Sequence, residues 1–430
     1  MPCQSAESAT RPDAVPRRLP RRVLYVQHAG CLGGSATSLK YLVQGMQAAG
    51  VECTVALARP TGELEDFYRE AGIRTLPAPD IRCWDHSTVA PRFLTNPRHV
   101  LDLASVALNW QASRRATLAL VEHLQPDLVH LNSMPLSSSA SALLDEGVPF
   151  VWHVREPPPD QGRRTAIIRG IMRRSPHCVF ITRHDREQWV GDGHGTIIYN
   201  CVPDEWFAGR SAATAEEAGQ GRPVKFAYLG GASIPKGVET MLAALRLLDR
   251  VETPWECVMP GFLPDARHAG RERFAKRLAR RLGYRNLRDR LLPRFLKLGP
   301  AVRPLPFTRD IRALLAEVDF VLFPALSAHF PRPVIEAAAL GKPAVGTAVG
   351  GVDECIVPGE SGILCDPGDA ASLADALERL IRDPDLRRSL GAGAYERAVA
   401  VHSLSAQHRA VAALYQDVLT APRTTPRGDA

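Results

Sequence analysis

The chain has 430 residues, of which 45% are hydrophobic and 23% are charged, and its formal net charge is +7. This composition is typical of a globular protein and excludes a disordered or fibrous one. The length exceeds what one hydrophobic core usually supports, so we expect two domains. No apolar run is long enough to cross a bilayer, and the arginine-rich segment 1–22 lacks the apolar centre of a signal peptide. We therefore expect a cytoplasmic protein that starts with a disordered leader over residues 1–22.

The cysteines are scattered along the chain rather than paired. They lie at positions 3, 31, 53, 83, 178, 201, 257, 355 and 365. No C-x-x-C pair occurs, which argues against a zinc ribbon and against a redox motif. We expect most of them to be small buried hydrophobic side chains.

Short apolar segments alternate with helical patterns over the first half of the chain. Strands are expected at 22–27, 53–58, 128–131, 150–153, 178–182 and 196–199, and helices at 38–49 and 64–71. Such alternation indicates a parallel sheet covered by helices, as in a doubly wound, Rossmann-like α/β domain. We assign residues 23–207 to this first domain.

A second domain of the same kind is expected after a linker. Residues 208–222 are small or polar and show no apolar periodicity, which is typical of a linker. Further strands are expected at 225–229, 256–259, 301–304, 320–323, 344–346 and 362–365, within a second Rossmann-like domain over 223–404. Two such domains face each other across a cleft, and ligands of open α/β sheets bind at the carboxyl ends of the strands.

The C-terminal part of the chain has a helical pattern. Helices are expected at 372–381, 385–390, 392–399 and 405–419. We expect the last of them to cross back to the first domain. The polar tail 420–430 is expected to be disordered.

A glycine-containing loop follows the first expected strand of each domain. The first loop contains Gly33 and Gly34, and the second contains Gly230 and Lys236. Glycines let backbone amides approach a phosphate closely, and a lysine can pair with a diphosphate. The first loop does not have the G-x-G-x-x-G spacing, so it gives little support for a nicotinamide cofactor. A tight turn without a ligand is the alternative for the first loop, and a solvated lysine is the alternative for the second.

The segment around Glu336 is the most informative in the chain. It predicts a helix that begins behind Pro333, carries Glu336 on its first turn and stops at Gly341. An apolar strand and a turn with Gly350 and Gly351 follow. A carboxylate at one helix start and backbone amides at the next suit a sugar nucleotide, whose hydroxyls need acceptors and whose phosphates need donors.

One histidine stands at the carboxyl end of an expected strand. From this position His153 can reach a sugar hydroxyl or move a proton. A hydrogen-bonded histidine in the core is the alternative.

Two segments are rich in arginine. In 163–174 the arginines surround apolar residues, a basic amphipathic pattern that can lie on an anionic membrane surface. A solvated helix face is the alternative. The basic segment 267–297 can likewise touch a membrane or an acidic acceptor. Neither segment has the aromatic interleaving that single-stranded nucleic acid requires, so we expect no nucleic-acid partner.

Several short motifs follow one another in a characteristic order. They are Gly33-Gly34, Gln125-Pro126-Asp127-Leu128-Val129-His130, His153-Val154-Arg155-Glu156, Tyr199-Asn200, Gly230 with Lys236-Gly237, Asp319, Pro333-Val334-Ile335-Glu336-Ala337, Gly350-Gly351 with Glu354, and Gly362. With these motifs the chain resembles the retaining GT-B glycosyltransferases of family 4, the glycosyl transferases group 1. The resemblance covers most of residues 23–380.

The resemblance implies an enzyme that moves a sugar from a nucleotide-sugar donor to a glycan, lipid-linked or small-molecule acceptor. Retention of anomeric configuration is implied, and no metal or other cofactor is needed because lysine and amides neutralise the leaving diphosphate. By position, Lys236 is the catalytic cation on the diphosphate, Glu336 binds the donor ribose and His153 lies by the transferred sugar. The remaining donor-binding positions that the resemblance implies are Gly33, Gly34, Gly230, Gly350, Gly351 and Glu354.

The chain departs from the family pattern at two positions. The glutamate expected eight residues before Glu336 is Ala328, and the arginine expected in the second glycine loop is Gly231. His329 and Arg332 are candidates to take the place of the missing charged groups. Two other functions stay open: a catalytically inactive homologue that acts as a binding or regulatory subunit, and a sugar-nucleotide epimerase on the same fold.

Overall fold

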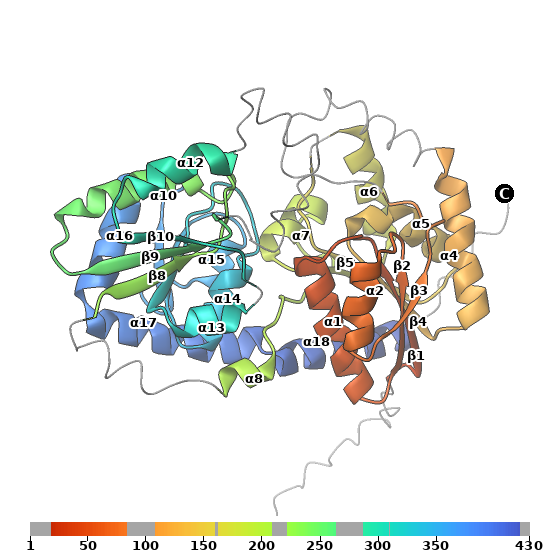
Figure 1. Ribbon diagram of the computed structural model, residues 1–430. Coiled ribbons are helices and arrows are strands. Elements are labelled where there is room, and N and C mark those ends of the chain that lie inside the picture. Colours follow the sequence, from red (N-terminus) through yellow and green to blue (C-terminus); the bar gives the residue numbers. More distant parts are fainter. Residues whose placement is uncertain are drawn as a thin grey trace, which may run out of the picture.

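The computed structural model describes residues 19–83, 108–159, 162–208, 222–263, 287–308 and 310–421. These residues form two α/β domains that stand side by side, each built on one parallel β-sheet (Figure 1). Apolar clusters lie on both faces of each sheet, as in a doubly wound fold. The predicted fold of two Rossmann-like domains is therefore confirmed. The leader up to residue 18, most of the linker, the part of the basic segment 267–297 that precedes residue 287, and the tail from residue 422 fall outside the described residues.

The first sheet has seven strands in the order β3-β2-β1-β4-β5-β6-β7. The strands are β1 (Arg22–Gln27), β2 (Glu52–Leu57), β3 (Arg74–Pro77), β4 (Leu128–Asn132), β5 (Phe150–Val154), β6 (Cys178–Phe180) and β7 (Thr196–Ile197). Every residue of β4 and β5 is buried because helices cover both faces of the sheet, which explains their apolar sequences. The strand order reverses between β1 and β4, so the carboxyl ends of these strands border a crevice.

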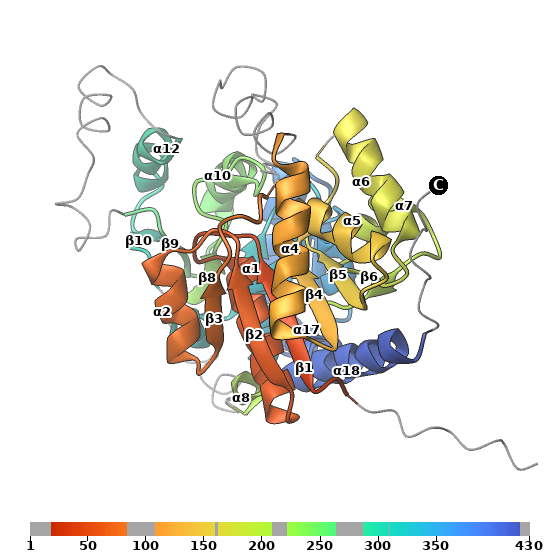
Figure 2. The same ribbon diagram turned by 90° about the vertical axis from the view of Figure 1, so that its right-hand side faces the viewer.

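The helices of the first domain pack on this sheet (Figures 1 and 2). They are α1 (Gly34–Ala48), α2 (Gly62–Glu70), α4 (Trp110–Leu124), η1 (Met134–Leu136), α5 (Ser137–Asp145), α6 (Arg163–Arg174) and α7 (Arg183–Val190). The short helix α8 (Asp204–Phe207) instead packs against the second domain through Trp206 and Phe207. α1 follows β1 in the chain, and α7 follows β6. The N-termini of both helices therefore lie at the edge of the sheet where the carboxyl ends of the strands are.

The second sheet has six strands in the order β10-β9-β8-β11-β12-β13. The strands are β8 (Val224–Tyr228), β9 (Trp255–Pro260), β10 (Val302–Leu305), β11 (Phe320–Phe323), β12 (Ala344–Thr347) and β13 (Gly362–Cys365). The helices are α10 (Val238–Leu247), η2 (Leu248–Arg250), α12 (Leu287–Leu296), α13 (Ile311–Ala316), α14 (Arg332–Ala339), α15 (Val352–Cys355), α16 (Ala370–Arg382) and α17 (Pro384–Arg397). All strand pairs of both sheets are parallel.

Three local predictions were wrong. β3 was not expected, because this short edge strand is only half-buried and has an arginine and a proline at its ends. The predicted break between two helices at Gly391 does not exist, because α17 runs through this residue. A Cβ at Gly391 would lie 2.2 Å from Gly341 O, so the glycine allows a close packing of the helix on a turn. Glu336 lies in the second turn of α14, because this helix begins one residue before Pro333.

The chain crosses between the domains twice, and the two crossings pair with each other. Val202 N donates to His402 O at 2.8 Å, and Leu404 N donates to Val202 O at 3.0 Å. The second crossing follows the π-helical turn η4 (Ala398–His402) and continues into α18 (Leu404–Thr420). Figure 1 shows α18 continuing from the second domain to run beneath the first. The two connections between the domains are therefore hydrogen-bonded to each other.

The C-terminal helix α18 packs against the first domain. Its residues Val411, Leu414, Tyr415 and Val418 are buried in the same apolar cluster as β1 and α1. The Tyr415 hydroxyl lies 2.7 Å from His130 Nδ1 on β4. The end of the chain thus completes the core of the domain in which the chain begins.

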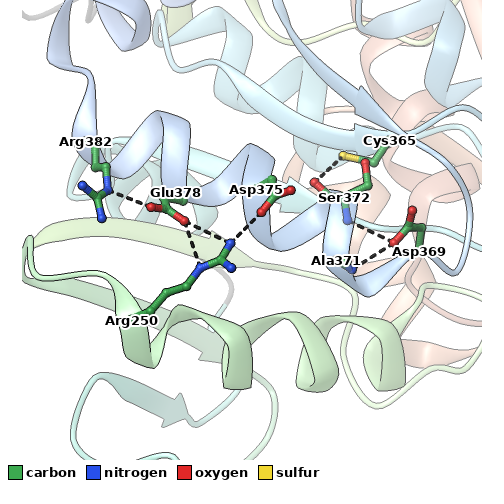
Figure 3. Close-up of polar contacts among 8 residues, drawn as sticks. All are labelled: Arg250, Cys365, Asp369, Ala371, Ser372, Asp375, Glu378 and Arg382. Carbon is green, nitrogen blue, oxygen red and sulfur yellow. Dashed lines mark hydrogen bonds and ion pairs between the residues drawn. The ribbon is translucent and has the colours of Figure 1, made fainter.

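A polar network lies on the outer face of the second domain (Figure 3). Arg250 bonds to Asp375 and Glu378 of α16 at 2.6 and 3.2 Å. Asp369 caps α16 by accepting from two backbone amides of its first turn at 2.9 and 3.0 Å. Arg250 and Asp375 are largely exposed, so the ion pair contributes only about 0–1 kcal/mol. The buried apolar side of α16 holds the helix in place.

Helix α6 contains the first arginine-rich segment. Its residues Ile168, Ile171 and Met172 are buried in the core of the first domain, whereas Ile167 is exposed. These contacts favour the solvated helix face over a membrane-binding face. None of the described helices combines the length and the hydropathy that a membrane crossing requires. Of the described cysteines, Cys31 is exposed and the others are buried.

Candidate functional site

A cavity of about 430 Å³ lies between the two domains. The first domain lines it with residues that include Gly34, Ser35, Ser38, Arg155, Asp185 and Asn200. The second domain lines it with residues that include Lys236, Ala328, His329, Arg332 and Pro333. The lining residues follow the carboxyl ends of strands or start helices, where ligands of open α/β sheets bind. The cavity is therefore the candidate site.

The glycine loop of the second domain presents Lys236 to the cavity. The Tyr228 hydroxyl lies 3.1 Å from both Gly231 O and Lys236 O, so it supports the loop from below. A Cβ at Gly230 would lie 2.3 Å from this hydroxyl. Gly237, which follows the lysine, has φ +73° and would place a Cβ 1.7 Å from Pro324 O. The glycines therefore let the loop close over a tyrosine and fix the position of the lysine.

Lys236 is a cation without an ion-pair partner within the described part of the chain. Burial lowers its pKa. The neighbouring His329 has its pKa lowered to about 4, first by burial and then by the charge of Lys236, and its ring stacks on Phe323 at 5.8 Å. The histidine is therefore neutral at neutral pH. Lys236 provides the positive charge on this side of the cavity.

Arg332 and Glu336 form an ion pair on successive turns of α14. Arg332 Nε donates to Glu336 Oε1 at 2.7 Å. Burial raises the pKa of Glu336, and the arginine opposes this rise. Arg332 Nη1 also donates across the domain boundary to Ser38 Oγ at 3.3 Å. Arg332 thus lines the cavity, while Glu336 lies behind it and does not line the cavity.

The turn at Gly350 and Gly351 packs against the first domain. A Cβ at Gly350 would lie 2.2 Å from Cγ of His184, at the start of α7. Gly351 has φ +87°, and a Cβ there would lie 2.8 Å from His329 O. A side chain at position 350 would therefore push the two domains apart. A side chain at position 351 would displace the cavity wall at His329.

Glu354 joins the two domains. Its buried carboxylate accepts hydrogen bonds from Arg183 N at 2.8 Å and His184 N at 3.0 Å, the first two amides of α7. It also accepts from the Tyr199 hydroxyl at 2.9 Å. A carboxylate at a helix N-terminus satisfies amides that lack an intrahelical partner. Glu354 therefore faces the first domain and does not line the cavity.

His153 lies at the end of β5, behind Arg155. Its Nδ1 atom lies 3.2 Å from His130 Nε2 and 3.4 Å from Arg155 Nη2. A guanidinium can only donate, so Nδ1 accepts and the proton of the neutral imidazole is on Nε2. Burial, followed by the charges of Arg155 and His130, lowers the pKa of His153. The Nε2 atom has no hydrogen-bond partner in the described part of the chain.

The structure brings together some of the predicted residues and adds others. Gly34, Lys236, His329 and Arg332 line the cavity, and Gly33 caps α1 beside it. The predicted residues that lie behind the cavity wall are His153, Gly230, Glu336, Gly350, Gly351 and Glu354. Among the described residues, no group of three His, Cys, Asp or Glu side chains is arranged to hold a metal ion.

Asp185 and Arg155 are cavity residues that sequence reasoning did not identify as candidates. Burial raises the pKa of Asp185 to about 7; a hydrogen bond with Thr182 opposes this rise, and the charges of Glu156 and Glu354 add smaller contributions to it. In the sequence, Asp185 stands three residues after Thr182, a spacing that indicates only a capped helix start. Arg155 follows an expected strand and belongs to the motif His153-Val154-Arg155-Glu156, but neither feature gave it a role in the site.

Comparison with protein families shows two matches along the chain. A model described as Glycosyltransferase Family 4 matches residues 32–206, and one described as Glycosyl transferases group 1 matches residues 212–397. Together they take in most of both domains.

Curated relatives match over shorter segments. N-acetyl-alpha-D-glucosaminyl L-malate synthase of Bacillus anthracis is 38% identical over 87 residues, which are 20% of this chain and 23% of that protein. Alpha-D-kanosaminyltransferase of Streptomyces kanamyceticus is 28% identical over 197 residues, 46% of this chain and 46% of that protein. In both cases the chain spans less than half the length of the relative.

Solved structures match over nearly the whole chain. Anabaena HepE in complex with UDP and glucose has a TM-score of 0.66 at 17% identity, with 91% of this chain and 98% of that chain covered. Sucrose-phosphate synthase from Thermosynechococcus elongatus has a TM-score of 0.66 at 18% identity, with coverages of 94% and 100%. Likeness at this level of identity shows a shared fold.

Proposed function

Because the chain belongs to the group 1 glycosyltransferases of the GT-B fold, we propose that it transfers a sugar from a nucleotide-sugar donor to a hydroxyl-bearing acceptor. We further propose that the reaction retains the anomeric configuration and uses no metal ion. The observation that carries the proposal is the interdomain cavity, in which Lys236 has no carboxylate partner within the described part of the chain. A buried cation of this kind suits the diphosphate of a nucleotide sugar.

The donor would lie against the second domain. In this arrangement Lys236 contacts the diphosphate, and Gly34 offers an amide at the start of α1, where a helix favours negative charge. Glu336 would accept from the ribose hydroxyls only after Arg332 moves aside, because Glu336 lies behind Arg332 at the cavity wall. HepE has been solved with UDP-glucose, so a uridine nucleotide sugar is the first donor to test.

The reaction would proceed on the face of the sugar from which the diphosphate leaves. The acceptor oxygen forms the new bond to the anomeric carbon, the bond from that carbon to the diphosphate oxygen breaks, and the acceptor proton passes to the leaving phosphate. Lys236 and the amide at Gly34 stabilise the negative charge on the diphosphate. His153 would act on the transferred sugar through Arg155, which it holds by a hydrogen bond, because His153 itself lies behind the cavity wall. We assign to Glu354 and the adjoining glycines the task of holding the domains in the closed arrangement.

The alternative of a catalytically inactive homologue is favoured by two residues, Ala328 and Gly231, which replace charged groups. The cavity nevertheless contains carboxylates and further cations, because Asp185 and Glu156 line it together with Arg155. A cavity with these charged groups supports an active enzyme over a subunit that has lost its site.

A screen of donors tests the proposed function. Purified protein would be heated with UDP, GDP and ADP sugars, since a bound donor raises the melting temperature by mass action. The stabilising donor would then be incubated with acceptors, and NMR would report the configuration of the new glycoside. We expect transfer with retention that persists in a chelator such as EDTA. Donor binding without turnover of any acceptor would favour the inactive homologue, and a new sugar nucleotide formed without acceptor would indicate an epimerase.

A further inference from the structure

The guanidinium of Arg155 is held in the cavity by neutral groups alone. Nε donates to Asn132 Oδ1 at 2.6 Å, and Nη1 donates to Asn200 Oδ1 at 2.7 Å. Nη2 donates to His153 Nδ1 at 3.4 Å. A guanidinium has five N–H donors, so two of them are not used by these acceptors.

The adjacent carboxylate is turned away from this guanidinium. Glu156 Oε1 accepts from the Ser133 hydroxyl, and Oε2 accepts from the backbone amides of Met134 and Arg155 at 3.4 and 3.3 Å. Within the described part of the chain, no carboxylate forms an ion pair with Arg155. Burial lowers the pKa of Arg155 to about 10, against the opposing effect of the nearby Glu156 charge, so the guanidinium stays charged at neutral pH.

The acceptors around Arg155 are themselves fixed. Asn132 Nδ2 donates to Gln27 Oε1 at 2.6 Å and to Ser35 Oγ at 3.1 Å, so its oxygen faces the arginine. His153 is held by His130, which in turn meets the Tyr415 hydroxyl of α18. These fixed acceptors hold the side chain of Arg155 at the cavity wall, with no carboxylate in hydrogen-bond contact within the described part of the chain. A part-buried guanidinium with two unused donors is suited to bind an anionic oxygen group from outside the chain.

We infer that Arg155 binds an anionic oxygen group, a phosphate or a carboxylate, of a substrate in the interdomain cavity. This inference rests on the proposed function, because it takes the cavity to be the substrate site. The group can belong to the acceptor or to the diphosphate of the donor. The acceptor is favoured by the position of Arg155 on the first domain, since Lys236 faces the cavity from the second domain. The predicted acceptor is then a sugar, polyol or lipid-linked glycan that carries a phosphate or carboxylate.

Binding measurements with UDP and with inorganic phosphate separate the two sources. Both probes would be titrated by calorimetry into wild-type protein, Arg155→Gln and the matched control Arg173→Gln, an exposed arginine on α6. Phosphate would also be titrated into protein saturated with UDP. We expect Arg155→Gln to weaken phosphate binding to the UDP-saturated protein about ten- to a hundred-fold, the size of a lost charge-assisted contact, with UDP binding unchanged.

The other outcomes are equally informative. A similar loss in UDP affinity would keep the anion site and assign it to the donor diphosphate. Equal affinities of wild type and Arg155→Gln for both probes would overturn the inference. If wild type binds no nucleotide at all, the proposed function fails, while the titration with phosphate alone still decides the role of Arg155.

A second variant leaves the arginine in place. Asn200→Asp would put a carboxylate 2.7 Å from Nη1 and so provide an internal counter-ion. We expect this variant to raise the melting temperature and to lower phosphate affinity about as much as Arg155→Gln does. Unchanged phosphate affinity in a folded Asn200→Asp protein would contradict an external anion on Arg155.

Discussion

Replacing Glu354 by glutamine is expected to loosen the contact between the two domains. The carboxylate of Glu354 is only 4% exposed and accepts three hydrogen bonds from the first domain, at 2.8, 3.0 and 2.9 Å. Glutamine keeps one acceptor oxygen but turns an N–H₂ group toward a backbone N–H. The variant therefore lacks the negative charge and one or two of the three hydrogen bonds.

The size of the effect follows from these bonds. Hydrogen bonds to a charged group contribute about 1.5–3 kcal/mol each, and they are not additive when they share one carboxylate. We therefore expect Glu354→Gln to destabilise the start of α7 by about 2–3 kcal/mol. The Arg183 guanidinium, 3.5 Å from the carboxylate, is 59% exposed and adds little.

Amide hydrogen exchange measures this loss locally. Protection of the Arg183 and His184 amides should fall about thirty- to a hundred-and-fifty-fold in Glu354→Gln, because exchange reports the free energy of local opening. The matched control is Asp353→Asn, which alters the exposed carboxylate next in the sequence. Protection in Glu354→Gln equal to that in Asp353→Asn would refute a role for Glu354 in joining the domains.

Three further predictions concern pH dependence, the C-terminal helix and the glycine turn. The raised pKa of Asp185, from 3.8 to about 7, means that the folded protein holds a proton that the unfolded chain releases. The resulting stabilisation is complete below about pH 4 and is lost as the pH rises through about 7. The free energy of unfolding of Asp185→Asn, measured in urea, should therefore rise relative to that of wild type by up to ~4 kcal/mol between pH 4 and pH 8. Parallel pH profiles of the two proteins would contradict this. Tyr415→Ala should destabilise the first domain by about 3–5 kcal/mol in urea unfolding, because the side chain is completely buried, whereas the exposed control Arg409→Ala should change little. Gly350→Ala should lower donor affinity by forcing the domains apart, and adding His184→Gly should restore it, because the Cβ of His184 alone would lie 2.8 Å from the new methyl group; an unaffected single variant would show that the close approach is unimportant.

Much of the fold could be predicted because its strands are short apolar runs between glycine and proline turns. β11, for example, has the predicted bounds Phe320–Phe323 and is buried throughout. β3 escaped prediction because its sequence, Arg-Thr-Leu-Pro, carries no apolar run. Helix ends were harder to predict where a glycine allows close packing inside a helix, as Gly391 does. The sequence alone does not show the neighbouring backbone that requires this glycine.

The candidate site could be predicted only one domain at a time. Lys236 was identified because it follows a glycine loop, a local pattern. Arg155 and Asp185 join it in the cavity only because the domains are placed together, partly by the contact of Glu354 with Arg183, 171 residues away in the sequence. The same contact explains why Glu354, expected to complete the donor pocket, faces the other domain.

The central claim is that Lys236 neutralises the leaving diphosphate of a nucleotide sugar. Its most direct test is single-turnover consumption of the stabilising donor by wild type, Lys236→Ala and the exposed control Lys297→Ala. We predict that the rate constant of Lys236→Ala falls about a hundred- to a thousand-fold, as for the loss of one preorganised charge-stabilising group, while Lys297→Ala resembles wild type. A Lys236→Ala protein that consumes the donor at the wild-type rate would contradict the account.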